Sequence, residues 1–466
     1  MNQVYDRIIL NGQVVLPGGT YRLDIGIIGG KIAAISESLA DSPADEMVDA
    51  EGKFVLPGMI DIHVHFNEPN FGHWEGFATG SSALAAGGCT TYADMPLNGN
   101  PPTVTPEALA LKGELANGNS AVDYTFWGGL VPGKLDQLEK LAEEGVRGFK
   151  AFMSNPGGEG EGRFREVDDL TLYEGMKKIA ALGGFVALHA ESDAITSALA
   201  EQAILEGRTD ARAFVASRPV IAELEAVNKA ILFSEQTGCE VHFVHISSVE
   251  AVELIDRAKK RGIPVTVETC PHYLLLTDED MADIGPAAKC APPLRGREQK
   301  EGLWRLLAEG KLDVIASDHS PCPPELKLDE SLSFFEAWGG IAGAQSSVEL
   351  VLDEGFIKRG IPLHKLVELL SAGPAKRFGL YPQKGQIAVG ADADLVLVDA
   401  SRSYTLTEDQ LWQRHKVSPY LGRKFACKVT TTLVRGITVY TEEQGVNPVK
   451  QGQLLLQPLH APQQTP

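Results

Sequence analysis

The sequence predicts an α/β protein in which a (β/α)8 TIM barrel is joined to a smaller β-sandwich domain. The chain has 466 residues, which suits a barrel of roughly 250–320 residues with a smaller partner. Short apolar runs alternate with amphipathic stretches through the middle, whereas both ends are rich in β-forming residues and turn signals. We therefore expect an N-terminal part of the β-sandwich at 1–55, the barrel at 56–378, a C-terminal part of the β-sandwich at 379–450 and a flexible tail at 451–466.

The two ends share the pattern of an antiparallel sheet. Near the N-terminus, turn signals at Asn11-Gly12, Gly18-Gly19 and Gly29-Gly30 separate short alternating runs, which predicts hairpins. A similar pattern returns at 385–390, 393–400 and 429–443. We expect the two ends to pair into one β-sandwich, an inference that rests on this shared pattern alone.

The middle of the chain has the pattern of repeated βα units. Helix-like segments such as 135–145, 172–184 and 250–262 lie between apolar runs of strand length. The candidate strands are 55–66, 89–96, 123–130, 148–154, 184–190, 240–247, 264–271 and 312–320. Eight parallel strands with intervening helices predict a closed barrel, whose active site lies at the C-terminal ends of the strands.

Composition excludes several classes of function. The formal net charge is −20 and no cluster of Lys and Arg offsets it, which argues against nucleic acid or an anionic membrane surface as partner. We see no signal peptide and no apolar stretch that approaches the ~20 residues of a membrane span. The six cysteines are scattered without a CxxC pair, so we expect reduced thiols and a cytoplasmic location.

Residues that can ligate metals fall where the predicted strands end. His63 and His65 are two apart on the first strand, so both imidazoles point to one face. Further candidates lie on the fourth, fifth, sixth and eighth strands, namely Lys150, His189, His245 and Asp318. Each alone has an ordinary structural explanation, but their appearance in order at strand ends indicates a metal site. His242 is three residues before His245, so strand alternation predicts that it faces the helical layer instead.

Several segments resemble the amidohydrolase superfamily, in its cyclic amidase branch of dihydroorotases, hydantoinases and allantoinases. They are 55–66, 148–154, 187–191, 241–247 and 316–321. The resemblance covers nearly the whole chain and implies two divalent metal ions and a homotetramer. It assigns one ion to His63, His65, Lys150 and Asp318, and the other to Lys150, His189 and His245.

Lys150 requires a chemical change to fit this assignment, because an ammonium cannot ligate a cation. Two nearby divalent ions disfavour its protonated form, and the resulting neutral amine can add CO₂ to give a bridging carbamate. Two bridged ions would supply a hydroxide at neutral pH to attack the ring carbonyl. Asp318 would act as general base and then as general acid toward the departing ring nitrogen. Histidine and carboxylate ligands suit Zn, Co, Fe and Mn, among which we expect Zn.

The ring that is opened is indicated by two departures from other members of the branch. Asn67 stands where dihydroorotases usually have an arginine for the substrate carboxylate, and Asn155 stands where hydantoinases usually have a tyrosine. Segments 71–98 and 289–297 resemble allantoinases. This resemblance implies hydrolysis of (S)-allantoin to allantoate in purine degradation. A hydantoinase or dihydropyrimidinase type of activity remains an alternative, as does a non-catalytic scaffold homologue.

Substrate contacts are expected by resemblance at the rim of the barrel. The candidates are Asn98, Asn155, Cys290, Ala291, Ser320 and the glycine-rich loop 338–340. Cys290 is expected to line the pocket and not to act as a nucleophile, because no paired histidine is evident. His272 follows the seventh strand, where it has either a structural role or one next to the metal ligands.

Overall fold

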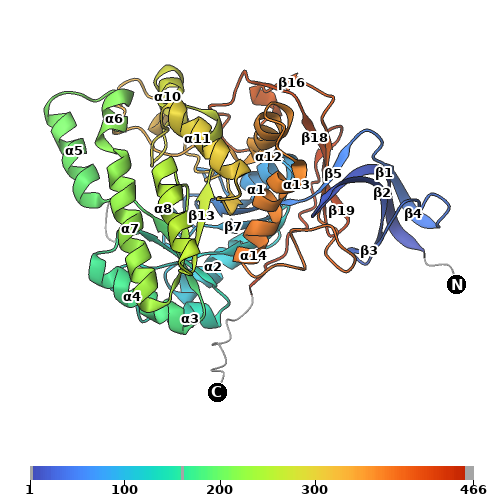
Figure 1. The fold of residues 1–466 in the computed structure, drawn as a ribbon, viewed down its shortest axis with the longest axis horizontal. Coiled ribbons are helices and arrows are strands. Elements are labelled where there is room, and N and C mark those ends of the chain that lie inside the picture. Colours follow the sequence, from blue (N-terminus) through green and yellow to red (C-terminus); the bar gives the residue numbers. More distant parts are fainter. Residues whose placement is uncertain (1–3, 159–161, 457–466) are drawn as a thin grey trace.

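A barrel and a separate mixed sheet make up the computed structural model, which describes residues 4–158 and 162–456 (Figure 1). Each predicted barrel segment contains a strand, and most observed strands are shorter than the predicted segments. They are β6 (Met59–Val64), β7 (Cys89–Asp94), β8 (Asp123–Phe126) continued by β9 (Gly128–Gly129), β10 (Gly148–Phe152), β11 (Phe185–His189), β12 (Glu240–Phe243), β13 (Val265–Thr269) and β14 (Val314–Ile315).

Parallel pairing closes the strands into a barrel. Strands β6 to β8 form one parallel sheet and β9 to β14 form another. The two sheets are joined where β9 follows β8 along the chain. On the other side, the backbone just after β14 closes the ring, because His65 N donates to His319 O at 2.8 Å. The carboxyl ends of β6 and β14 therefore meet, and this brings the predicted ligands of the first and eighth strands together.

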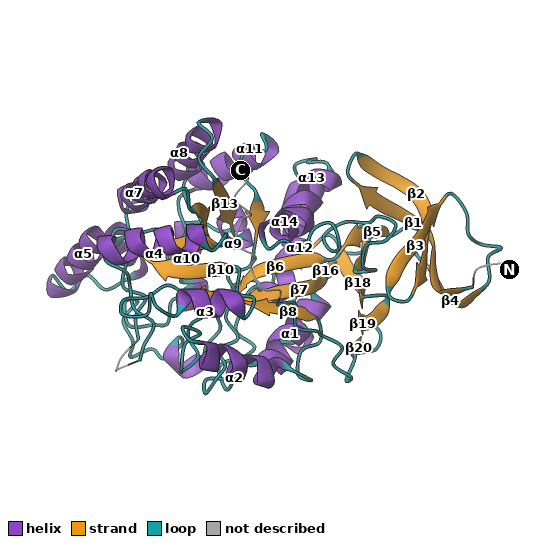
Figure 2. Ribbon diagram, turned by 90° about the horizontal axis from the view of Figure 1, so that it is seen from below, coloured by secondary structure: helices purple, strands orange, loops and turns teal. Residues whose placement is uncertain are grey.

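Helices surround the barrel, as Figure 2 shows in purple. The longer ones are α1 (Phe77–Ala86), α2 (Pro106–Ala116), α4 (Asp169–Ala181), α5 (Asp193–Leu205), α7 (Val220–Thr237), α8 (Val249–Lys260) and α11 (Arg297–Ala308). The shorter ones are α3 (Leu138–Glu143), α6 (Ala211–Ser217), α9 (Pro271–Leu275), α10 (Asp278–Ile284), α12 (Ser347–Val351), α13 (Leu363–Val367) and α14 (Gly373–Arg377). Two π-helical stretches, Leu352–Ile357 and Glu368–Ala372, continue α12 and α13. In the part of the chain that the structure describes, no helix is long and apolar enough to cross a membrane.

Apolar side chains fill the barrel below the strand ends. Trp127 belongs to this cluster and packs edge-on against Phe185, with 5.3 Å between the ring centroids. Gly148 on the neighbouring strand leaves room for the indole, since a Cβ there would lie 2.3 Å from the Trp127 ring. The packed interior forms the floor on which the polar groups of the upper barrel stand.

The second unit is one antiparallel and parallel sheet built from both ends of the chain (Figure 1, right). Its strands are β1 (Tyr5–Leu16), β2 (Gly19–Ile28), β3 (Lys31–Ser36), β4 (Ala44–Asp49), β5 (Phe54–Pro57), β15 (Leu395–Asp399), β18 (Lys428–Val434), β19 (Ile437–Thr441) and β20 (Gly445–Val446). A small separate ladder joins β16 (Tyr404–Thr405) to β17 (Lys424–Phe425). Strand β5 pairs with β15, so the expected union of the two ends is confirmed.

Two details of the sheet differ from the sequence-based expectation. Asn11-Gly12 is not a hairpin turn: β1 runs through it, and the register shifts between Ile9 and Gly12 as in a β-bulge. The segment 385–390 is a loop and not a strand. The turns at Gly18-Gly19 and Gly29-Gly30 are as predicted.

The start of the predicted tail is part of the fold. Gly452 N donates to Ser120 O, Tyr124 N donates to Gln453 O, and Leu455 N donates to Tyr124 O, at 2.7 to 2.9 Å. Residues 451–456 therefore run along β8 and were wrongly expected to be flexible. The rest of the predicted tail, 457–466, lies outside the described residues.

Candidate metal centre

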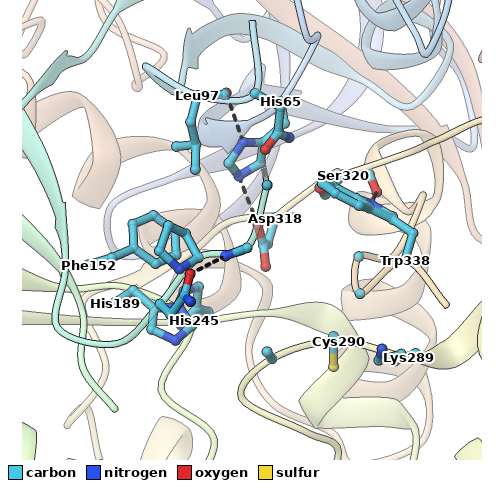
Figure 3. A pocket seen from close by; sticks show the side chains of 18 of the residues that line it. His65, Leu97, Phe152, His189, His245, Lys289, Cys290, Asp318, Ser320 and Trp338 are labelled. Carbon is cyan, nitrogen blue, oxygen red and sulfur yellow. Dashed lines mark hydrogen bonds and ion pairs between the residues drawn. The ribbon is translucent and has the colours of Figure 1, made fainter. Parts of the chain in front are cut away.

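Side chains from the ends of β6, β10, β11, β12 and β14 converge at the top of the barrel. Figure 3 labels His65, His189, His245 and Asp318 among them. Asp318 Oδ1 lies 3.2 Å from His63 Nε2 and 3.4 Å from His65 Nε2. His189 Nδ1 lies 3.1 Å from His245 Nε2. Potential ligand atoms of His63, His245 and Asp318 all lie within 4.8 Å of one another, so the residues predicted from strand positions form one cluster.

Backbone conformation brings two of these residues to the cluster. His245 has a φ of 39° and Asp318 has a φ of 49°, in the left-handed region that few non-glycine residues occupy. Both residues lie just beyond their regular strands, β12 and β14. At His245 the positive φ interrupts the strand alternation, since the preceding Val244 already belongs to the apolar cluster inside the barrel. Such strained backbone is typical of functional sites.

Lys150 stands among these groups without a hydrogen-bond partner. It is fully buried, and its Nζ has none among the described residues. Burial lowers the pKa of Lys150 to about 8, although Asp318 and Glu268 act in the opposite direction. A buried amine without an ion pair is costly unless it is neutral or modified. Lys150 thus fits a residue that changes its chemical state to serve the cluster.

The protonation states of the cluster suit divalent cations. Burial lowers the pKa of His63, His189 and His245, which leaves their imidazoles neutral at pH 7 with a free lone pair. Burial opposes ionisation of Asp318, but the neighbouring histidines hold its pKa well below the ordinary value. Neutral imidazoles and an ionised carboxylate are the donor set of a metal site. The predicted ligands therefore fit the ions that they were expected to hold.

Two carboxylates that the sequence reasoning did not single out orient these histidines. Glu268 Oε1 lies 2.7 Å from His63 Nδ1, and Glu191 Oε2 lies 2.8 Å from His189 Nε2. Arg218 donates to the same Glu191 oxygen at 2.5 Å. Burial alone would raise the pKa of Glu191, but Arg218 and His189 lower it to about 2. Glu191 was detectable in the sequence, since it follows His189 by two residues, whereas nothing marked Glu268.

The prediction that His242 faces the helical layer is wrong. In the β11–β12 ladder His242 pairs with Ala187, which belongs to the apolar cluster inside the barrel, so its side chain points inward. Its Nε2 lies 3.1 Å from Glu268 Oε2. The prediction assumed that alternation continues to His245, but the regular strand ends at Phe243. Both histidines therefore face the interior.

A cavity of about 380 Å³ lies over the cluster, and its walls include every predicted substrate contact. These contacts are Asn98, Asn155, Cys290, Ala291, Ser320 and the loop 338–340. In Figure 3, Ser320, Trp338 and Cys290 lie across the cavity from His189 and His245. Predicted ligands and predicted contacts thus share one space. His272 is buried but does not line this cavity, and burial lowers its pKa to about 4.

Two buried lysines hold the cavity wall formed by the loop 335–340. Lys289 Nζ donates to the carbonyls of Phe335, at 3.0 Å, and Ala337. Lys327 Nζ donates to the carbonyls of Trp338, at 3.1 Å, and Gly340. This arrangement could not be recognised from the sequence, because neither lysine pairs with an acidic side chain among the residues that the structure describes.

Gly340 allows the wall to lie close to the end of the eighth strand. A Cβ at Gly340 would lie 2.5 Å from Ser320 O, so a side chain there would displace the loop. Trp338 Nε1 donates to the same Ser320 carbonyl at 3.1 Å. The close approach of the loop to Ser320 therefore requires a glycine at position 340.

Comparison with known proteins agrees with the geometry. The profile of the amidohydrolase family matches residues 54–439. An allantoinase of Rubrobacter xylanophilus is 51% identical over 433 residues, which cover 93% of this chain and 94% of that protein. An allantoinase of Deinococcus radiodurans is 49% identical over 93% of this chain and 95% of its own length. The structure of L-hydantoinase (dihydropyrimidinase) from Arthrobacter aurescens superimposes with a TM-score of 0.93 at 36% identity, covering 97% of this chain and 100% of that chain.

Proposed function

The chain belongs to the amidohydrolase family, and from this premise we propose that it hydrolyses the ring amide of (S)-allantoin to give allantoate. The observation that carries the proposal is the similarity to enzymes named allantoinase, at up to 51% identity over nearly the whole chain. A hydrolase of cyclic amides also suits the cluster of histidines and a carboxylate under the cavity. The reaction would serve purine degradation.

We propose that the cluster holds two divalent ions. His63 Nε2 and Asp318 Oδ1 support this, because they are buried acceptors 3.2 Å apart and repel each other unless a cation lies close by. When bound, a pair of divalent ions lowers the pKa of a shared water and polarises the carbonyl under attack. Zinc is the proposed metal, and cobalt, iron and manganese suit the same donors. One ion would be held by His63, His65, Lys150 and Asp318, and the other by Lys150, His189 and His245.

Lys150 would join the two halves of the cluster as a carbamate. Its pKa of about 8 leaves a larger neutral fraction near pH 7 than an ordinary lysine has. The neutral Nζ can add to the carbon of CO₂ and release a proton, which gives a carbamate with two oxygens. The absence of a hydrogen-bond partner for Nζ among the described residues supports this modification.

Asp318 is the proposed catalytic residue. Its low pKa keeps the carboxylate ionised at neutral pH, so it can accept the proton of the attacking water. It then returns that proton to the ring nitrogen, which is a poor leaving group until it is protonated. Oδ1 lies within 3.4 Å of His63 Nε2 and His65 Nε2, so the carboxylate stands beside the proposed metal ligands.

The cavity suits a neutral ring. Of the cationic side chains that line it, Arg218 pairs with Glu191 and Lys289 donates to backbone carbonyls, while Lys150 is the residue proposed to become the carbamate. Asn67 donates through Nδ2 to Pro321 O at 3.3 Å and accepts from Asn98, so no guanidinium stands in the place where it would clamp a carboxylate. Polar neutral groups at Asn98, Asn155 and Ser320 remain to bind amide and ureido groups.

A hydantoinase or dihydropyrimidinase activity is the second candidate, supported by the TM-score of 0.93 to L-hydantoinase. Allantoin, 5-substituted hydantoins, dihydrouracil and dihydroorotate should be assayed side by side after reconstitution with metal and bicarbonate. We expect the largest kcat/KM for allantoin. If a hydantoin or dihydrouracil is opened faster than allantoin, the proposed substrate is wrong and the second candidate activity is correct. Binding of less than one equivalent of metal, with no ring opening, would instead support a non-catalytic scaffold.

We also propose a cytoplasmic location and a homotetramer. All six cysteines are free and buried, which agrees with a reducing compartment. The tetramer is supported by the resemblance to cyclic amidases, and light scattering of the purified protein tests it.

A further inference from the structure

His242 is a buried histidine below the metal centre that the proposed reaction does not use. Its Nδ1 lies 2.8 Å from Thr266 Oγ1, and its Nε2 lies 3.1 Å from Glu268 Oε2. The other oxygen of Glu268 contacts His63 Nδ1 at 2.7 Å and accepts from the backbone N–H of His245 at 3.1 Å. A continuous chain of hydrogen bonds thus joins the barrel interior to two proposed metal ligands.

The direction of each hydrogen bond in this chain follows from Glu268. An ionised carboxylate only accepts, so the rings of His63 and His242 must both donate to it. The proton of His63 therefore sits on Nδ1, and its Nε2, which faces Asp318, keeps the lone pair that a metal ion needs. With the proton of His242 on Nε2, its Nδ1 accepts the hydroxyl hydrogen of Thr266. Every donor in the chain meets an acceptor.

Glu268 requires an anchor to keep this arrangement. One oxygen, Oε1, serves both His63 and His245, and rotation about the terminal torsion of a glutamate is soft. His242 is the group that holds the second oxygen. Without His242, the carboxylate of Glu268 is free to turn away from His63. The His63 ring then loses the acceptor that keeps its proton on Nδ1.

We propose that His242 is a positioning residue of the metal centre, which acts through Glu268 to hold His63 in the tautomer that ligates metal and His245 in its turned backbone conformation. This inference rests on the proposed metal centre and is independent of the substrate. It assigns a role to a residue that touches neither ion nor substrate.

A pair of substitutions separates this role from simple packing. His242→Gln keeps an N–H that can reach Glu268, whereas His242→Leu fills the space without a donor. Zn²⁺ binding to the metal-stripped protein is measured by competition with a chromophoric chelator, followed by kcat and KM for allantoin. We expect His242→Leu to weaken Zn²⁺ binding by about 10–100-fold. It should also lower kcat with little change in KM, and His242→Gln should recover most of both losses.

Glu223→Gln is the matched control, because Glu223 is an equally buried carboxylate that accepts hydrogen bonds from Ser247 and Ser248 instead. It should reduce thermal stability and leave Zn²⁺ affinity as in the parent. The proposal is overturned if His242→Leu binds Zn²⁺ like the parent, or if His242→Gln loses as much affinity as His242→Leu.

If His242→Leu does not fold, Thr266→Val decides, since it removes only the hydroxyl that orients His242. It must weaken Zn²⁺ binding in the same direction, and unchanged binding would refute the proposal. Because Zn²⁺ binding is read without substrate, a protein that binds the ions normally but leaves allantoin intact would contradict the proposed function and not this inference.

Discussion

The two sides of the cavity are built by different means. On the metal side, His63, His189 and Asp318 come from the ends of parallel strands, and buried carboxylates orient the two histidines. On the opposite side, the loop 335–340 has no regular structure of its own and is held by Lys289 and Lys327 through backbone carbonyls. The metal side is therefore held by contacts between side chains, whereas the loop is held by contacts from two buried lysines to its backbone carbonyls. We expect substitutions on the two sides to separate metal binding from substrate binding.

The largest effect should come from Lys150→Ala. It removes the group shared by both proposed ions, and we expect the kcat for allantoin to fall by about a thousand-fold or more, with loss of bound metal. Metal content by mass spectrometry and turnover should fall together. Short-chain carboxylic acids should restore part of the activity by supplying the missing oxygens. If the Lys150→Ala variant keeps two ions and its activity, Lys150 is not a metal ligand.

A smaller effect, of the opposite kind, should follow from Lys289→Met. The substitution leaves the carbonyls of Phe335 and Ala337 without their buried donor, which costs about 1–3 kcal/mol per unsatisfied group. We expect KM for allantoin to rise about tenfold as the wall moves, while the metal content stays unchanged. Lys365→Met is the control, since Lys365 also donates to a backbone carbonyl, that of Ala308, but on an exposed surface. Loss of metal in Lys289→Met would contradict the expectation that the loop affects substrate binding without affecting metal binding.

The smallest effects should appear in the pH dependence of stability, with the two sides responding at opposite ends of the scale. Glu191 has a pKa of about 2 in the fold against an ordinary 4.5. Its contribution is therefore complete above about pH 4.5 and is lost as the pH falls toward 2. In urea titrations of the metal-stripped protein between pH 5 and 3, Glu191→Gln should flatten the decline of the unfolding free energy. A parent-like slope in that variant would show that other carboxylates control the acid response.

Lys289 behaves in the opposite sense. Burial, together with the nearby Lys327, lowers its pKa to about 7 from an ordinary 10.5. Between these values the unfolded chain binds a proton that the folded chain has released, so stability rises with pH. Lys289→Met should remove part of this rise between pH 7 and 10.

The metal side could be predicted from the sequence, because each proposed ligand is recognisable by its own position at the end of a strand. Strand parity placed His63 and His65 on one face, and barrel topology placed Lys150, His189 and Asp318 beside them. The same parity failed at His242, since the positive φ of His245 interrupts the alternation that the prediction assumed. Lys289 and Lys327 could not be predicted to hold the loop, because their partners are backbone carbonyls, which carry no side-chain signal. These carbonyls lie 46 and 48 positions along the chain from Lys289 and 11 and 13 positions from Lys327.

The segment 451–456 has a consequence for the open side of β8. A strand with unpaired N–H and C=O groups is a template for pairing with another chain, and residues 452–455 occupy that position against Ser120 and Tyr124. Gly452 fits because a Cβ there would lie 2.1 Å from Val122 O. Removing these residues, or replacing Gly452 by a larger residue, exposes the edge of a barrel strand and invites aggregation. A purification tag is therefore better attached beyond residue 456 than in place of this segment.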